Sequence, residues 1–409
     1  MKKIYIISSV SIVFLISYFL FEPIFNYTSG WFDLPKAEQL HPVITHTDSV
    51  SKKADHLLKT IYTNLKAPAI SVAVSSNKGI VWSNAIGYKD AEHKIAVTTD
   101  TKFRIGSTSK ALTSLGVGVL LENEKLSLHS TVKDFVPYAS NTLKPITLKE
   151  LASHTSGIRN YGTCFCFPVW EYYNNDEYDT VEESIGIFNG DDLLFDPGTD
   201  FSYSSYNYTV LSAMIEGASK TDFESFMTKK VFEPLKITDI IFEKESIASP
   251  TISKFYDVEG VKTKEAYRVN NSNKWAGGGL LATPSSLVTL GKAFLSNELF
   301  TKQTMLSLLQ PVPLKNGQVN EQNYAIGWRN DTVNDKLGTN IQTQILHHGG
   351  TAMGSTSLLI LFPEHHLSVS IIMNRSGSSS ELFEHAYDIA KLFLSEMKKE
   401  NNLFLNEKH

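Results

Sequence analysis

A serine and a lysine three residues apart open a largely apolar run in RIGSTSKALTSLGVGVLLENEKL, residues 104–126. On a helix this spacing places Lys110 beside Ser107 on one face. If burial removes the proton of the lysine, its amine can accept the hydroxyl proton and make Ser107 a nucleophile. Free N–H groups at the helix start would then stabilise negative charge on an oxygen. The alternative is that Ser107 or Ser109 caps the helix while Lys110 reaches out to water.

Two later segments carry side chains that could complete such a site. In FDPGTDFSYSSYNYTVLSAMIEGAS, Tyr203 follows a Pro-Gly turn and leads into an apolar helix expected over Tyr208 to Ala218. In LHHGGTAMGSTSLLILF, His348 and two glycines shortly precede an expected strand. Glycines there let a substrate lie along the strand edge and expose a backbone N–H, as an oxyanion hole requires. Taken alone, the tyrosine is typical of core packing and the His-Gly-Gly of an ordinary turn.

The elements that must position these residues gather strands at both ends of the chain. Alternating and apolar runs predict strands near each end, and helical spacing dominates residues 107–305. We therefore expect an α+β fold with two lobes: an antiparallel sheet of N- and C-terminal strands flanked by helices, and a mainly helical lobe from the middle of the chain. A cleft between the lobes is the natural place for a site. The expected strands are 70–74, 80–86, 357–362 and 367–373, and the expected helices include 54–65, 285–294 and 380–399.

Composition and charge exclude some partners. The chain has 409 residues, 42% of them hydrophobic, and a formal net charge of -5 with no basic block, so we expect no nucleic-acid partner. Cys164 and Cys166 are too close in sequence to close a stabilising loop and lack a second pair for a zinc site, so we expect unpaired cysteines in a loop. No other spacing of metal ligands is present, and we expect neither a metal nor another cofactor.

The N-terminus predicts a membrane segment. Lys2 and Lys3 precede an uncharged, mainly apolar stretch from Ile4 to Phe21, which is long enough to cross a hydrocarbon layer as a helix. Because no small-residue cleavage site follows, we favour an uncleaved anchor over a removed signal peptide. By the positive-inside rule the body would lie outside the cytoplasm.

Seven motifs, in the same order along the chain, resemble those of the serine β-lactamase and penicillin-binding-protein superfamily. The similarity covers about residues 48 to 395 and is to the class C-like branch, which includes D-alanyl-D-alanine carboxypeptidases and esterases. Within that branch it is closest to the mitochondrial serine β-lactamase-like proteins and their bacterial relatives. The motifs are TDTKFRIGSTSK, ITLKELASHTSGI, PGTDFSYSSYNYTVL, WAGGGLLATPSSL, YAIGW, HGGTAMG and SIIMN.

The resemblance assigns roles to three catalytic residues. Ser107 matches the acylated serine, Lys110 the lysine that takes part in its deprotonation, and Tyr203 the tyrosine that acts as general base and then as acid. Ser205 stands where the family's Tyr-x-Asn element has its asparagine, which weakens the expected contact with a substrate amide. A second alignment would place Asn207 in that role, but its distance from the Pro-Gly turn favours Tyr203.

The resemblance also assigns the substrate-binding strand. His348, Gly349 and Gly350 fall on the family's Lys/His-Thr/Ser-Gly element, and Thr351 would supply the second oxyanion N–H beside that of Ser107. With a reference pKa of about 6.5, His348 would be partly cationic at neutral pH and would attract a carboxylate in a pH-dependent way. Gly349 lacks the hydroxyl of relatives. Both changes suggest weak or absent activity on β-lactams, and His154 in SHTSG is expected to be structural.

The sequence therefore predicts an extracytoplasmic serine hydrolase that forms an acyl-enzyme on an ester or amide, with a small-molecule or peptide substrate. It would be anchored in a membrane with its domain in the bacterial periplasm or at the cell surface, or secreted if the N-terminal segment is cleaved. A D-Ala-D-Ala carboxypeptidase remains an alternative, as does a non-catalytic penicillin-sensor or homo-oligomeric scaffold domain. The expected divisions are an anchor or signal peptide (1–21), a linker (22–47), the hydrolase domain (48–399) and a tail (400–409).

Overall fold

The computed structural model describes residues 10–17, 28–42, 48–162, 170–244 and 249–406. Most of the expected membrane segment and both cysteines, Cys164 and Cys166, lie outside these residues. Within the described ranges no helix combines the length and apolarity needed to cross a bilayer.

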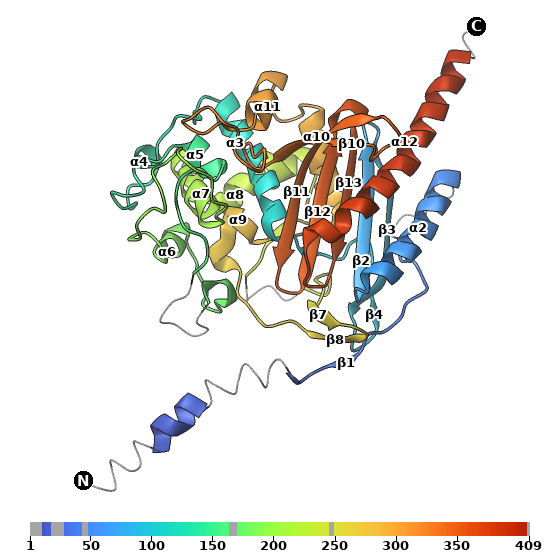
Figure 1. Cartoon of the computed structure of the whole chain (residues 1–409), viewed down its shortest axis with the longest axis horizontal. Helices are drawn as coiled ribbons and strands as arrows, with labels where there is room; N and C mark the ends of the chain where they lie inside the picture. Colours follow the sequence, from blue (N-terminus) through green and yellow to red (C-terminus); the bar gives the residue numbers. More distant parts are fainter. Residues whose placement is uncertain (1–9, 18–27, 43–47, 163–169, 245–248, 407–409) are drawn as a thin grey trace.

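A seven-stranded antiparallel sheet joins the two ends of the chain, as expected (Figure 1). The join is the pairing of β13 (Leu367–Met373) with β2 (Ala69–Ser76), in which Val369 lies opposite Val74. Strands β2, β12 and β13 are buried along their whole length, because helices cover both faces of the sheet. In spatial order the strands are β10 (Arg329–Asn334), β11 (Gln342–Ala352), β12 (Ser355–Phe362), β13 (Leu367–Met373), β2 (Ala69–Ser76), β3 (Gly79–Asp90) and β4 (Ile95–Ala96).

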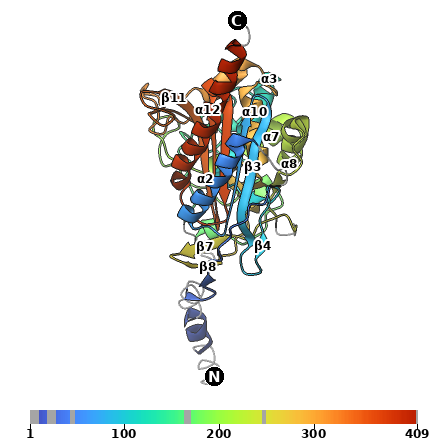
Figure 2. The same ribbon diagram turned by 90° about the vertical axis from the view of Figure 1, so that its right-hand side faces the viewer.

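Helices α2 (Ser49–Leu65) and α12 (Phe383–Asn406) lie side by side on one face of the sheet (Figure 2). The helical spacing of apolar residues predicted α2, and these residues form its buried face, with Leu58 and Ile61 fully buried. Because α12 continues to Asn406, most of the expected tail is helical.

Helix α10 (Pro284–Leu295) covers the opposite face of the sheet and does not belong to the separate helical lobe in which we expected it. The reason is its close approach to the strands. A Cβ at Gly291 would lie 2.5 Å from Leu361 Cδ2, and the Ser75 hydroxyl donates to the carbonyl of Val288 at 2.8 Å. Helix α10 therefore packs its apolar face against the sheet.

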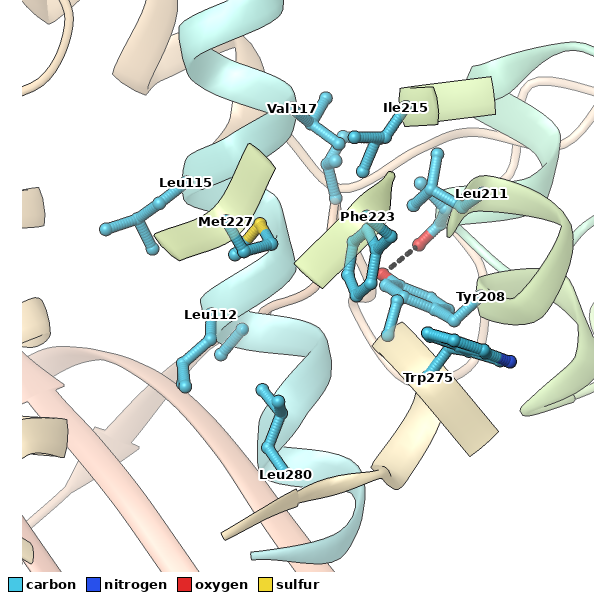
Figure 3. Close-up of a cluster of buried hydrophobic side chains, with 14 of the residues drawn as sticks. Leu112, Leu115, Val117, Tyr208, Leu211, Ile215, Phe223, Met227, Trp275 and Leu280 are labelled. Atoms are coloured by element: carbon cyan, nitrogen blue, oxygen red, sulfur yellow. Dashed lines mark hydrogen bonds between the residues drawn. The ribbon is translucent and has the colours of Figure 1, made fainter. Parts of the chain in front are cut away.

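The helical lobe is built around α3 (Ser109–Glu122) and α7 (Tyr206–Ser219). Figure 3 shows Val117 of α3 beside Ile215 of α7, and Met227 of α8 (Phe223–Met227) next to α3. Helix α3 is apolar almost all round because it is enclosed on nearly all sides. The lobe also contains α4 (Val132–Phe135), α5 (Leu148–Ala152), α6 (Val181–Ile185), α9 (Trp275–Gly278) and α11 (Lys302–Leu309).

Two small three-stranded sheets, which the sequence patterns did not predict, accompany the lobes. Their short strands carry too few residues for a clear periodicity. One of them includes part of the expected linker, because Phe32 and Asp33 pair with β8 (Lys262–Glu265). Another part of the linker contacts the seven-stranded sheet, where His41 N–H donates to Ala85 O of β3 at 2.8 Å. The sheets are β1 (Phe32–Asp33), β8 (Lys262–Glu265) and β7 (Tyr256–Glu259), and β5 (Phe103–Arg104), β9 (Leu280–Ala282) and β6 (Ile241–Phe242).

Candidate active site

A short 3-10 turn, η1 (Gly106–Thr108), presents Ser107 where β5 turns into α3. Gly106 has φ +47°, and a Cβ at this position would lie 2.6 Å from the carbonyl oxygen of Thr351, so a larger residue would be both strained and obstructed. The Thr108 hydroxyl lies 2.8 Å from that of Ser357, which donates to Ile105 O at 2.7 Å. These contacts fix the turn against β11 and β12.

The capping alternative is wrong. Neither η1 nor α3 has a side-chain cap hydrogen bond, and Ser109 is buried with a hydroxyl that has no partner among the described residues. Lys110 does not reach water, since its side chain is 0% exposed. Ser107 alone of these residues is half-buried, so its hydroxyl is the one that a molecule in the adjoining cavity can meet.

Lys110 Nζ lies at the centre of three polar contacts. It is 3.2 Å from Ser107 Oγ, 3.1 Å from Ser205 Oγ and 2.6 Å from the carbonyl oxygen of Gly277. Burial lowers the pKa of Lys110 well below its usual 10.5, and the positive charges of Arg329 and Lys274 lower it further. The site therefore favours the neutral amine.

A neutral amine has two hydrogens and one lone pair. Gly277 O can only accept, so it takes one hydrogen of Lys110. If Ser205 Oγ takes the second, the lone pair remains for the hydroxyl proton of Ser107. This is the arrangement that a general base requires.

Tyr203 lines the same cavity as Ser107. Its hydroxyl is buried and makes no hydrogen bond to another residue of the described ranges. Burial raises the pKa of Tyr203 to about 12, although the nearby Ser107 hydroxyl and the charge of Arg329 oppose the rise. The phenol therefore keeps its proton at neutral pH and can donate it.

His154 supports Tyr203 from behind, in agreement with the structural role expected for it. The two ring centroids are 4.1 Å apart. Nδ1 of His154 accepts from the Ser204 N–H at 3.3 Å and from Asn207 Nδ2 at 3.2 Å, which places the ring proton on Nε2. Asn207 also binds the Ser156 hydroxyl at 2.5 Å. Asn207 is thus an internal brace and lies outside the cavity lining, as does Ser205, which contacts Lys110 instead.

His348 differs from the expectation of a partly cationic side chain. It precedes the expected strand, β12, but itself lies inside β11, a strand that the sequence did not predict, and it is 1% exposed. Its Nδ1 donates to the carbonyl oxygen of Gly349 at 2.7 Å, and its Nε2 lies 2.8 Å from the Tyr324 hydroxyl. Burial and the charges of Arg329 and Lys110 hold the pKa of His348 well below 6.5. The imidazole is therefore neutral at physiological pH.

The glycines after His348 allow β11 to run close to its neighbours. A Cβ at Gly350 would lie 1.9 Å from Ile105 O, and one at Gly349 would lie 2.1 Å from Ser379 Oγ. β10 pairs with β11 only as far as Arg329 opposite His347. Beyond that point η1 lies against β11, which brings the backbone of Thr351 next to the turn that carries Ser107.

The cavity in front of Ser107 has a volume of about 370 Å³.

Sequence reasoning missed several residues of the site. Tyr324 is the first residue of the YAIGW motif, Arg329 directly follows that motif, and Gly277 belongs to WAGGG, so the motifs pointed to these positions without assigning them a role. The serines at 378–380 lie in no motif, so the sequence gave no signal for them. The cavity is lined by Ser107, Tyr203, Arg329, His347, His348, Gly349, Thr351, Ser378, Ser379, Ser380 and Phe383.

Comparison with known proteins places this geometry in a family. Residues 54–393 match the Beta-lactamase family model. The human serine beta-lactamase-like protein LACTB, mitochondrial, is 28% identical over 407 residues, covering 78% of this chain and 73% of that protein.

Two solved structures share the fold. FmtA from Staphylococcus aureus has a TM-score of 0.69 at 22% identity, over 87% of this chain and 92% of that one. The octameric penicillin-binding protein homologue from Pyrococcus abyssi has a TM-score of 0.67 at 23% identity, over 84% and 77%. The chain therefore belongs to the Beta-lactamase family and is a serine hydrolase of the β-lactamase and penicillin-binding-protein type.

Proposed function

We propose that this chain hydrolyses an ester or amide through an acyl-enzyme on Ser107, with Lys110 as general base and Tyr203 as general acid. In acylation, Ser107 Oγ forms a bond to the substrate carbonyl carbon while its proton passes to Lys110 Nζ. The bond from that carbon to the leaving group then breaks, and the leaving group takes the phenolic proton of Tyr203. The Lys110 ammonium, 5.0 Å from the centre of the Tyr203 ring, returns a proton to the phenolate.

Water completes the cycle. Its oxygen attacks the acyl carbon, its proton goes to Lys110, and the Ser107 oxygen leaves and recovers that proton. The carboxylic acid product is released. In both steps the N–H groups of Ser107 and Thr351 would stabilise the negative oxygen, a contribution that the backbone contact between Gly106 and Thr351 supports.

The observation that carries the proposal is the set of three contacts around Lys110 Nζ. A fully buried lysine costs free energy unless its charge is lost or compensated, and no carboxylate of the described chain pairs with it. Such an expensive arrangement is typical of a functional site, and here it is aimed at the one half-buried hydroxyl of the turn.

The test is covalent labelling. A fluorophosphonate probe should add to the wild type, with the adduct seen by intact-protein mass spectrometry, and Ser107→Ala should abolish it. Ser109→Ala is the matched control, because this neighbouring hydroxyl is buried and unpaired and its loss should leave labelling intact. Labelling that survives Ser107→Ala would contradict the proposal.

We also propose that the catalytic domain lies outside the cytoplasm. The support is Lys2 and Lys3 followed by the apolar stretch Ile4 to Phe21. Alkaline phosphatase, which requires export to become active, should be active when fused after residue 47 in a bacterial host. Inactivity of this fusion, with activity of a β-galactosidase fused at the same point, would contradict the location.

A further inference from the structure

Helix α9 carries the carbonyl group that contacts the general base, but the helix is too short to fix its own direction. It has four residues, Trp275–Gly278, and the oxygen of Gly277 accepts from Lys110 Nζ at 2.6 Å. A single helical turn has little stability of its own in water. The direction of this carbonyl therefore depends on contacts between α9 and other elements, and the first of these contacts is made by Trp275.

The backbone of Trp275 is strained. Its φ is +39° and its ψ is -125°, a combination that suits glycine and costs free energy for a residue with a side chain. Such a conformation persists only where the surrounding contacts outweigh its cost. Here it turns the chain from a 3-10 turn, η5 (Ser272–Lys274), directly into α9, two residues before the carbonyl of Gly277.

The indole of Trp275 is anchored at its far end. It is buried in the hydrophobic core of the helical lobe (Figure 3). Its Nε1 donates to Ser184 Oγ of α6 at 2.8 Å, and that hydroxyl donates its own hydrogen to Thr180 O at 3.1 Å. Because the hydroxyl has one hydrogen, it acts toward the indole as an acceptor. The ring thus ties the first residue of α9 to α6.

The next two residues of α9 are held by α7 and its N-cap. The Ala276 N–H donates to Ser212 Oγ at 3.2 Å. A Cβ at Gly277 would lie 2.9 Å from the carbonyl oxygen of Ser205, so glycine is what allows this close approach. Together with the anchored indole, these contacts hold the Gly277 oxygen against Lys110 Nζ.

We propose that Trp275 is a positioning residue for the general base. Its bond to Ser184 and its strained backbone hold α9 so that the Gly277 carbonyl orients the Lys110 amine toward Ser107. Trp275 is outside the lining of the cavity in front of Ser107, so it acts through Gly277 and not on the substrate. This rests on the proposed function, because it requires Lys110 to deprotonate Ser107.

The test measures how fast a fluorophosphonate labels Ser107. Its fluoride leaves without a proton, so the maximal labelling rate, kinact, reports the deprotonation of Ser107 and does not depend on Tyr203. The probe concentration at half this rate, KI, reports binding. Trp275→Phe keeps an aromatic ring but loses the N–H. We expect kinact to fall roughly 3- to 10-fold, as the loss of one ordinary hydrogen bond allows, and KI to change less than about two-fold.

Trp82→Phe is the matched control. Trp82 is also buried, and its Nε1 donates to Asp55 Oδ1 at 2.9 Å. It belongs to the other hydrophobic cluster, between the sheet and helices α2 and α12. Both substitutions remove an indole hydrogen bond and should lower the melting temperature, but Trp82→Phe should leave kinact unchanged.

Ser184→Ala removes the bond from its other side and leaves the indole in place. We expect kinact to fall as it does in Trp275→Phe. The double variant should be no slower than the slower single variant, because the two substitutions break the same bond. Ser184→Ala also decides the matter if Trp275→Phe does not fold.

The possible failures are distinguishable. A wild-type kinact in Ser184→Ala or in folded Trp275→Phe, an equal loss in Trp82→Phe, or a rise in KI alone would overturn the inference, while loss of labelling in Ser107→Ala upheld the proposed function. Labelling that survives in Ser107→Ala, or no labelling of the wild type, would contradict both proposals.

Discussion

The carbonyl oxygen of Gly277 accepts a 2.6 Å hydrogen bond from Lys110 Nζ, and this bond orients the base of the site. A carbonyl cannot donate, so the shortest contact of the lysine always uses one of its hydrogens. The remaining contacts, at 3.1 Å to Ser205 Oγ and 3.2 Å to Ser107 Oγ, can then be one donated and one accepted bond. Gly277 thereby helps determine that the lone pair faces the nucleophile.

The pH profile follows from this neutral amine. Because burial lowers the pKa of Lys110, kcat/KM should fall only when acid protonates the amine, with a midpoint well below the usual 10.5. Tyr203, with its pKa raised to about 12, should cause no decline where an ordinary tyrosine ionises, near pH 10. A kcat/KM that rises only near pH 10 would contradict a neutral lysine.

Arg329→Gln supplies an internal check on that profile. The positive charge of Arg329 helps lower the pKa of Lys110, so its removal should raise this pKa and move the acid limb of kcat/KM to higher pH. An uncharged 4-nitrophenyl ester is the substrate to use, because it carries no charge for the guanidinium to attract. An acid limb that stays in place or moves to lower pH would assign the titration to another group.

Tyr203→Phe tests the general acid through the leaving group. With an amide, whose leaving amine needs a proton, kcat/KM should fall by about 10² to 10⁴. With a 4-nitrophenyl ester the fall should be much smaller, because nitrophenolate leaves without one. Tyr208→Phe is the control, since its buried hydroxyl donates to Ala152 O at 2.9 Å, outside the cavity lining, and it should affect both substrates equally. Equal losses with both substrates in Tyr203→Phe would indicate a packing role.

The sequence predicted the elements whose patterns are long. The hairpin of β12 and β13, helix α2 and the join of the two chain ends were confirmed, because sustained apolar periodicity reports burial directly. It did not predict that α10 packs on the sheet, since an apolar helix face does not specify its partner.

The site shows the same division between pattern and environment. Motif order identified Ser107, Lys110 and Tyr203, which the fold brings together. The prediction that His348 is partly charged was wrong. Its ionisation depends on burial and on the charge of Arg329, and the His-Gly-Gly motif shows neither. Arg329 itself was missed because its effect on the pKa of Lys110 and of His348 depends on a proximity in space that the sequence does not show.

Gly106→Ala tests the contact between the nucleophile turn and β11. The alanine would have to adopt φ +47°, and its Cβ would lie 2.6 Å from Thr351 O. The turn η1 must therefore move away from the strand. We expect a loss of about 1 to 3 kcal/mol of unfolding free energy, measured by denaturant titration, and a larger loss of acylation rate, because the two oxyanion N–H groups separate. Gly260→Ala, at φ +62° with nothing within 4 Å, isolates the cost of the backbone and should keep full activity.

The carboxylate of Glu171 should determine how stability responds to acid. It accepts from Arg159 Nη1 at 2.7 Å, from the Gly162 N–H at 2.8 Å and from the Tyr206 hydroxyl at 2.8 Å. Burial would raise the pKa of Glu171, but these bonds outweigh it and hold the pKa below 4.5, so this stability is present above pH 4.5 and is lost as pH falls through the lowered pKa.

Glu171→Ala should cost about 1 to 3 kcal/mol at neutral pH, because the Tyr206 hydroxyl and the Gly162 N–H lose their acceptor while the part-exposed Arg159 keeps its ion pair with Asp191, and should flatten the decline in stability below pH 4.5. Thermal unfolding at neutral and acid pH measures both effects. Glu384→Ala, which breaks the exposed pair with Lys336, should change neither. If the two variants lost equal stability, the brace between Arg159 and Glu171 would contribute no more than an ordinary surface pair.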